Sequence, residues 1–242
     1  MKWKRQLYIS LTGGLVMLLA MVSAAEAKDT APAPPSDIDP ANFVDQVDNK
    51  FFPLQPGMTF FYEGAADGIP IRTEVYVTHR TKRILGVKCT VVRERTYENE
   101  VLVEETFDWY AQDVDGNVWY FGEDSRELDP NGNVISTEGS WEAGVNGAQP
   151  GIVMQADPKV GDRYQQENAP GVAEDMAQVS SLKESACVPY GCYNNLPQTK
   201  EWTPLDKGVV EDKYYAEGVG FILGVMVKGG DERIELVSIT TE

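Results

Sequence analysis

Val101–Gly122 reads VLVEETFDWYAQDVDGNVWYFG, and this segment gives the clearest indication of the fold. Two runs rich in β-branched and aromatic residues, Val101–Gln112 and Val118–Gly122, flank the polar segment Asp113–Asn117. The Asp-Gly pair in that segment favours a tight turn, because glycine adopts a positive φ at no steric cost. The pattern therefore predicts an antiparallel hairpin of two strands.

The same pattern extends outward in both directions. Ile71–Ile84 alternates apolar and polar residues, and runs such as Tyr193–Thr203 and Arg233–Thr240 are separated by glycine- and proline-containing turns. Alternation of this kind is typical of strands, and no segment keeps a helical period over a dozen residues. We expect an all-β protein, a single curved antiparallel sheet or open barrel of about 10 strands with few short helices.

The first 27 residues have the pattern of a signal peptide. Lys2, Lys4 and Arg5 precede an apolar stretch, Leu7–Val22, which is followed by the small-x-small site Ala25–Ala27. The uninterrupted apolar part is shorter than the about 20 residues needed to span a bilayer. We therefore expect cleavage after residue 27 and a periplasmic or secreted protein.

The remaining chain divides into two parts. Residues 28–39 are rich in proline and alanine and predict a disordered linker, and residues 40–242 predict a single antiparallel β domain. No second apolar run of membrane-spanning length follows, so we expect no membrane span in the mature chain.

The 242-residue chain is acidic, with 21 Lys and Arg against 38 Asp and Glu and a formal net charge of −17. This charge disfavours nucleic acid and anionic lipid as partners. It predicts an acidic, solvated surface that favours cations or a basic envelope protein as partner.

Three cysteines occur in a chain expected to be exported. Cys187 and Cys192 enclose the turn-like segment 188–191, which predicts a disulfide worth about 2 kcal/mol on the chain-entropy model. Cys89 lies in an apolar run and is expected to be a buried thiol. With a single histidine, the chain offers too few ligands for a zinc site.

The turn of the 101–122 hairpin is also the candidate metal site. Asp113, Asp115 and Asn117 alternate like the first ligands of a calcium loop, with Asp124 at the twelfth position. Glycine stands at position four instead of six, however, and Asp124 replaces the usual glutamate. The alternative is a hairpin turn without metal. Calcium is the candidate cofactor because oxygen ligands are abundant.

Aromatic residues on the same hairpin form the candidate ligand site. Trp109, Trp119 and Tyr120 lie on its two strands, where one face of the sheet can line a groove for a sugar or lipid. The alternative is cross-strand packing in the core.

Catalytic signals are weak. His79 is the only histidine, and no Gly-x-Ser-x-Gly motif presents a serine to it. Two acid pairs lie near aromatic residues, Glu123 with Asp124 and Glu138 with Glu142, and paired carboxylates are the machinery of glycoside hydrolysis. We expect a protein that is not an enzyme, and the catalytic residues stay unknown.

Four phrases carry a resemblance to known proteins: DWYAQD with GNVWYFGED (108–124), GSWEAGV (139–145), AQPGIVM (148–154) and KYYAEGVG (213–220). They resemble a family of uncharacterised secreted bacterial proteins over most of the chain after residue 27. The last phrase is also similar to one in envelope domains with a lipoprotein-carrier-like curved sheet, which implies a concave apolar surface. Neither resemblance implies a catalytic residue.

These observations favour an exported, soluble envelope binding or accessory protein with an aromatic-lined concavity. Its expected ligand is an apolar molecule or a glycan, with calcium as the candidate assisting ion. Two alternatives are an extracellular polymer hydrolase that uses two carboxylates and a structural partner of a basic envelope component.

Overall fold

The computed structural model describes residues 38–242, so the expected signal peptide and all but the last two residues of the expected linker lie outside the described residues. The described chain begins with one 3₁₀ turn, η1 (Pro40–Asn42), and continues as strands. The strands are β1 (Phe43–Val44), β2 (Met58–Ala66), β3 (Ile69–Ile84), β4 (Val87–Glu98), β5 (Val101–Asp113), β6 (Val118–Leu128), β7 (Val134–Ser136), β8 (Trp141–Glu142), β9 (Gln149–Met154), β10 (Arg163–Gln165), β11 (Glu167–Asn168), β12 (Met176–Val188), β13 (Gly191–Thr203), β14 (Asp206–Ala216), β15 (Gly220–Lys228) and β16 (Arg233–Thr241).

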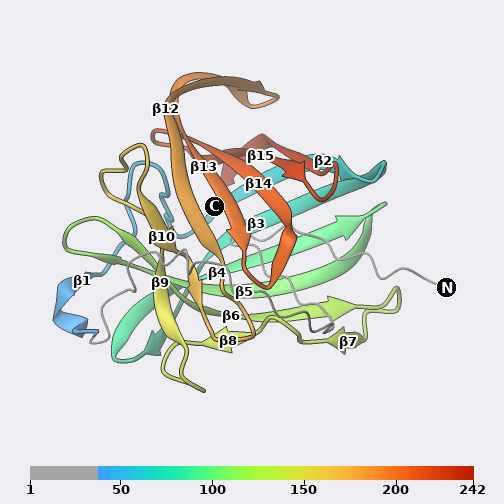
Figure 1. Ribbon diagram of the computed structural model, residues 1–242. Coiled ribbons are helices and arrows are strands. Elements are labelled where there is room, and N and C mark those ends of the chain that lie inside the picture. The colour runs from blue at the N-terminus through green and yellow to red at the C-terminus, as the bar shows by residue number, and fades with distance from the viewer. Residues whose placement is uncertain (1–37) are drawn as a thin grey trace, which may run out of the picture.

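The strands form one antiparallel sheet that curls round on itself. Its order is β10-β12-β13-β14-β15-β16-β2-β3-β4-β5-β6-β9-β11, with β1, β7 and β8 attached to β5 and β6. Figure 1 shows β2 to β6 sweeping across the molecule, with β12 to β15 over them. The two ends of the sheet are formed by consecutive pieces of chain. β10 pairs with β12 at one end, and β11, which begins two residues after β10, pairs with β9 at the other end. The segment 163–168 therefore joins the two ends of the sheet, which forms a nearly closed barrel.

The fold class is confirmed, and residues 38–242 form more strands than expected, 16 instead of about 10. The additional strands are mostly short: β1, β7, β8, β10 and β11 have two or three residues each. Alternation needs at least four residues to be recognised, so these strands leave no periodic signal in the sequence.

The β12–β13 hairpin extends beyond its neighbours, as Figure 1 shows. Its turn carries the predicted disulfide, Cys187–Cys192, with an S–S distance of 2.08 Å. β15 pairs with β16 only along Arg233–Glu235. The β12–β13 turn contacts the next residue of β16, because the Tyr190 N–H donates to the Leu236 carbonyl at 3.1 Å. The bridge thus closes a turn that contacts the barrel.

The core lies on the enclosed face of the sheet, which we define as the face that carries Tyr62, Tyr110 and Tyr120. On β2, β3 and β16 this face is mainly apolar, with buried Phe60, Val75 and Leu236. On β5, β6 and β11 it is acidic. Cys89 is a buried free thiol, as expected.

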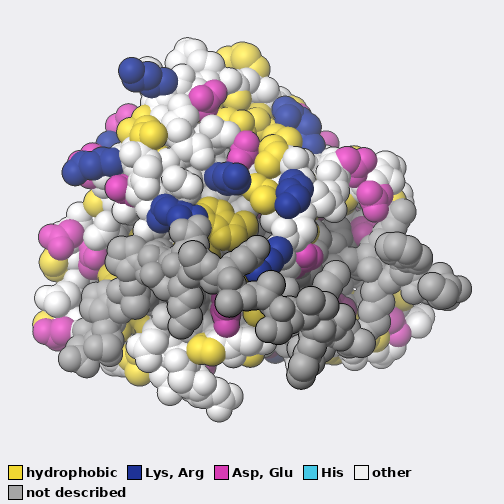
Figure 2. All heavy atoms as spheres, viewed as in Figure 1, with side chains coloured by type: hydrophobic (Ala, Val, Ile, Leu, Met, Phe, Trp, Pro, Cys, Tyr) yellow, Lys and Arg dark blue, Asp and Glu magenta, His cyan; other side chains and the backbone are white. Residues whose placement is uncertain are grey.

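Several of the acidic side chains are therefore inside the protein. Among residues 38–242 the buried carboxyl groups are Glu94, Asp108, Asp113, Glu123, Glu167, Asp175, Glu201 and Glu232. On the face shown in Figure 2, basic and acidic side chains are interspersed, and the basic ones gather beside exposed hydrophobic side chains in the upper half. The acidic, solvated surface stays a prediction, and not all acidic side chains contribute to it, because the alternation of β5 and β6 turns some of them toward the enclosed face.

Candidate functional site

The candidate site is built on β5 and β6 at the acidic part of the enclosed face. Tyr110 pairs with Tyr120 across these strands, and Asp108 pairs with Glu123. The two tyrosine rings stack with centroids 4.8 Å apart and planes inclined by 20°. Asp108, Tyr110 and Tyr120 are 0% exposed and Glu123 is 4% exposed, so two carboxyl groups and two phenols share a buried environment.

One phenol joins the two carboxyl groups. The Tyr120 oxygen lies 2.7 Å from Asp108 Oδ1 and 3.1 Å from Glu123 Oε2. A phenol has one proton to donate, so only one of these contacts can be a hydrogen bond from Tyr120. For the other contact to be a hydrogen bond, that carboxyl group must be protonated and donate to the phenol oxygen. Two hydrogen bonds at this point therefore require one carboxyl group to keep its proton, and we call this the shared-proton arrangement.

The pKa values agree with this arrangement. Burial raises the pKa of Asp108 to about 7, against the opposing effect of the Tyr120 hydrogen bond. Burial, and then the charge of Asp108, raise the pKa of Glu123 well above its ordinary value. Burial also raises the pKa of Glu104, four residues before Asp108 on β5, to about 7. Loss of water around a carboxylate disfavours its charged form, so protons are retained here near neutral pH.

Trp141 on β8 is the third aromatic residue of the site, beside Tyr110 and Tyr120. Its ring meets Tyr120 edge-on, with centroids 5.4 Å apart and planes at 89°, and its indole Nε1–H points to Glu167 Oε1 at 3.5 Å. Glu167 is fully buried on β11, where burial and then the charge of Asp175 raise its pKa. We call Asp108, Tyr110, Tyr120, Glu123, Trp141 and Glu167 the Tyr120 cluster.

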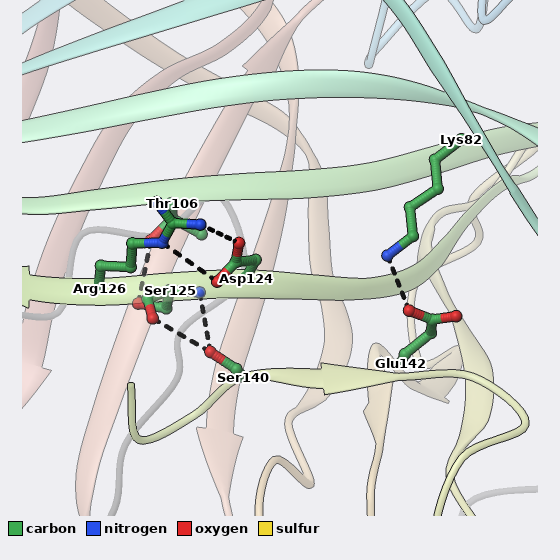
Figure 3. A network of polar contacts seen from close by, with 7 residues as sticks. All are labelled: Lys82, Thr106, Asp124, Ser125, Arg126, Ser140 and Glu142. Carbon is green, nitrogen blue, oxygen red and sulfur yellow. Dashed lines mark hydrogen bonds and ion pairs between the residues drawn. The ribbon is translucent and has the colours of Figure 1, made fainter. Parts of the chain in front are cut away.

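The residues on either side of Trp141 hold β8 against the barrel. Figure 3 shows both anchors: the Ser140 hydroxyl bonds the backbone of Ser125 at 2.9 and 3.1 Å, and the Glu142 carboxylate pairs with Lys82 Nζ at 2.7 Å. β8 can approach this closely because Gly122 has no side chain. A Cβ there would lie 2.2 Å from the Trp141 carbonyl oxygen.

A second polar group lies on β13 and β14. Lys213 Nζ is 2.9 Å from Glu201 and 3.4 Å from Glu211, all with side chains at most 16% exposed. Burial opposes the charge of Lys213, but Glu201 and Glu211 raise its pKa above the ordinary value. Burial raises the pKa of Asp175 to about 8, with Lys213 opposing. The lysine therefore compensates the carboxyl groups of β13 and β14.

Several buried polar atoms at the acidic end accept no hydrogen bond from residues 38–242. They are Asp108 Oδ2, Gln166 Oε1, Glu167 Oε2 and Asp175 Oδ1. An unpaired buried acceptor costs about 1–3 kcal/mol and more when it is charged. A ligand that brings hydrogen-bond donors would remove this cost.

The predicted ligand residues do not form one platform. Tyr120 lies on the enclosed face, whereas Trp109 and Trp119 lie on the opposite face and are only 7% and 6% exposed. Lys82 Nζ lies 3.2 Å from the centre of the Trp109 ring, and Phe43 of β1 packs edge-on against Trp119. The alternation of the strand separates these side chains, and β1 covers one of them.

Three of the four predicted calcium ligands, Asp113, Asp115 and Asn117, lie in one hairpin turn, and the fourth, Asp124, does not. Asp113 accepts from the backbone of Asp115 and Asn117 at 3.0 and 2.8 Å and from the Trp119 indole at 2.8 Å, which is the bonding of a hairpin turn. Asp124 lies far along β6, opposite Phe107, and pairs with Arg126 at 2.6 Å (Figure 3). Residues 38–242 contain no group of three or more His, Cys, Asp or Glu side chains that could hold a metal ion.

The predicted acid pairs are also separated. Glu123 faces the enclosed side, whereas Asp124 is bound to Arg126 on the other side, and Glu142 is paired with Lys82. The structure instead pairs Glu123 with Asp108. Sequence reasoning missed this pair because a bulge between Tyr110 and Asp108 in the β5–β6 register shifts the alternation.

No family model matches this chain, and it has no match among the curated proteins. Two solved structures are similar in fold. One is a protein of Bacteroides fragilis, inferred to be exported and with a YmcC-like fold, at 14% identity and a TM-score of 0.47 over 80% of this chain and 100% of that one. The other is an inferred lipoprotein of Parabacteroides distasonis, at 8% identity and a TM-score of 0.38 over 79% and 99%. None of the helices in the described part of the chain has the length and apolar character to cross a membrane.

Proposed function

We propose that this protein is an exported binding protein that holds a glycan at the Tyr120 cluster. Export rests on the signal-peptide pattern of residues 1–27 and on the resemblance to secreted bacterial proteins. The observation that carries the ligand class is the set of buried oxygen atoms without a donor, Asp108 Oδ2 and Glu167 Oε2 above all, beside stacked aromatic rings.

A sugar suits this combination better than an apolar molecule does. Sugar hydroxyls both donate and accept hydrogen bonds, and a carboxyl group that keeps its proton near neutral pH does the same. Aromatic faces pack against the apolar face of a sugar ring. At the apolar end, the pocket lined by Phe60, Tyr62 and Phe221 has a volume of only about 20 Å³, enough for one water molecule.

The test uses defined oligosaccharides, both neutral and amino-sugar-containing, titrated calorimetrically into the protein. The variants Tyr120→Phe and Asp108→Asn each remove one polar function and keep the side-chain shape. Tyr190→Phe, at the exposed β12–β13 turn, is the matched control. We expect at least one oligosaccharide to bind wild type and the control equally and both site variants at least tenfold more weakly. Equal binding to all four proteins would refute the assignment.

Glycoside hydrolysis is the second candidate, and one observation favours it. Asp108 Oδ1 and Glu123 Oε2 both contact the Tyr120 oxygen, so their separation is bounded by the two legs of 2.7 and 3.1 Å. This bound is compatible with the separation of about 5–5.5 Å between the two carboxyl groups of retaining glycosidases. A carboxyl group with a pKa near 7 is also suited to act as the general acid. Release of reducing ends that stops in Asp108→Asn and Glu123→Gln would establish hydrolysis. Binding without product would establish the binding protein.

A further inference from the structure

A groove of about 300 Å³ lies on the opposite face of the sheet, across β2, β3 and β4. Two registered rows of side chains line it. Phe61, Glu74 and Arg95 lie side by side in one row, and Tyr76 and Arg93 are partners in the next. These positions alternate with core residues, so the groove is separated from the Tyr120 cluster by the thickness of the sheet.

The charges in this groove are not equally available. Arg95 is paired with Glu105 at 2.8 Å, and Glu74 is paired with Arg72. Arg93 makes no ion pair with any residue of the 38–242 region, and its guanidinium lies 5.4 Å from the centre of the Tyr76 ring. Arg93 is therefore the cation that the groove offers to a ligand.

Two aromatic rings accompany this cation. Phe61 and Tyr76 are both half-buried and both line the groove, and Tyr76 donates to Glu242 Oε2 at 3.3 Å, which orients its ring. The Glu242 side chain is 68% exposed, so water screens its charge. A volume of about 300 Å³ is at the lower end of small-ligand sites, which suits one or two sugar rings.

We propose that this groove binds a carboxylated sugar ring, with the carboxylate at Arg93 and the ring against Phe61 and Tyr76. The planar guanidinium can donate two parallel hydrogen bonds to a carboxylate, and the aromatic faces exclude water from one side of the sugar. This site is distinct from the Tyr120 cluster and does not depend on the function proposed for it.

The test compares glucuronate, glucose and benzoate by calorimetric titration into the full protein. We expect glucuronate to bind at least tenfold more tightly than glucose, because glucose lacks the carboxylate, and more tightly than benzoate, which lacks the hydroxyls. Raising the salt concentration to about 1 M should weaken glucuronate binding. Glucuronate no tighter than glucose would overturn the role of the carboxylate, and benzoate equal to glucuronate would overturn the sugar assignment.

Two arginine variants test the position of the site. Arg93→Gln should weaken glucuronate binding at least tenfold, since it removes a charge-assisted pair of hydrogen bonds. Arg80→Gln is the matched control, because Arg80 is exposed, lies 5.9 Å from the centre of the Phe107 ring and does not line the groove. Similar losses in the two variants, or none in Arg93→Gln, would overturn the proposal. Thermal unfolding of both variants confirms that they are folded.

Discussion

Replacing Asp108 by asparagine should make the protein more stable at pH 8 and flatten its pH dependence. Burial raises the pKa of Asp108 to about 7 in the folded protein, from an ordinary value of 3.8. The folded state therefore binds this proton more tightly than the unfolded state does. The corresponding stability is fully present below about pH 4 and is lost as the pH rises through about 7.

The size of the effect follows from the shift. A shift of about 3 units at about 1.4 kcal/mol each corresponds to roughly 4 kcal/mol between pH 4 and pH 8 for an isolated group. Asp108 and Glu123 share the Tyr120 hydroxyl and titrate as a pair, so the stability lost as the pH rises belongs to both groups. The Asp108→Asn variant therefore removes only a part of this loss. Asparagine does not ionise, and its side-chain oxygen can still accept from Tyr120.

Urea unfolding followed by far-ultraviolet circular dichroism at intervals from pH 4 to pH 8 measures this effect. We expect the free energy of unfolding to fall by several kcal/mol for wild type and by at least 1 kcal/mol less for Asp108→Asn. Glu138→Gln removes an exposed carboxyl group and should behave like wild type. If the free energy of unfolding of Asp108→Asn falls as steeply with pH as that of wild type, Asp108 is ionised in the folded protein and the shared-proton arrangement is wrong.

Three further outcomes follow from the structure. Lys213→Met should lower the free energy of unfolding, measured in urea, by about 3–5 kcal/mol, because it leaves Glu201 buried without its cation. Adding Glu201→Gln to this variant should restore part of the lost stability. Reduction of Cys187–Cys192 should cost about 2 kcal/mol and speed hydrogen exchange at the β12–β13 turn, and unchanged exchange would contradict the contact with β16. Cys89, whose pKa burial raises to about 12, should resist iodoacetamide at pH 8 until urea unfolds the protein, as a mass spectrum would record.

The hairpin of β5 and β6 shows how far the sequence predicts the structure. The sequence predicts a strand over Val101–Gln112 and β5 is Val101–Asp113, because alternation and an Asp-Gly turn are local signals. The expected partner ended at Gly122, but β6 continues to Leu128. Gly122 does not end the strand. It has a φ of 124° and admits the backbone of β8, a contact with residues almost twenty positions further along the chain.

That glycine also explains why the candidate site could not be predicted. Strict alternation from Tyr120 would place Asp124 on its face and Glu123 on the other, and the bulge reverses this order. The third carboxyl group of the cluster, Glu167, arrives through β11, a strand of two residues that is recognisable only from its pairing with β9. Local patterns determine the strands, whereas the site depends on long-range register.

The acidic interior is costly to fold, and this cost is the strongest argument that it is used. Glu201 and Glu211 are compensated by Lys213, and Asp113 by the turn that it caps. Asp108 and Glu167 are compensated only in part, by Tyr120 and Trp141, since each keeps a second buried oxygen without a donor among the described residues. An apolar replacement at such positions is often neutral or stabilising, so stability alone does not account for them. Asp108 contacts Tyr120 and Glu167 contacts Trp141, and this juxtaposition of acceptors and aromatic rings is suited to a ligand rich in hydrogen-bond donors.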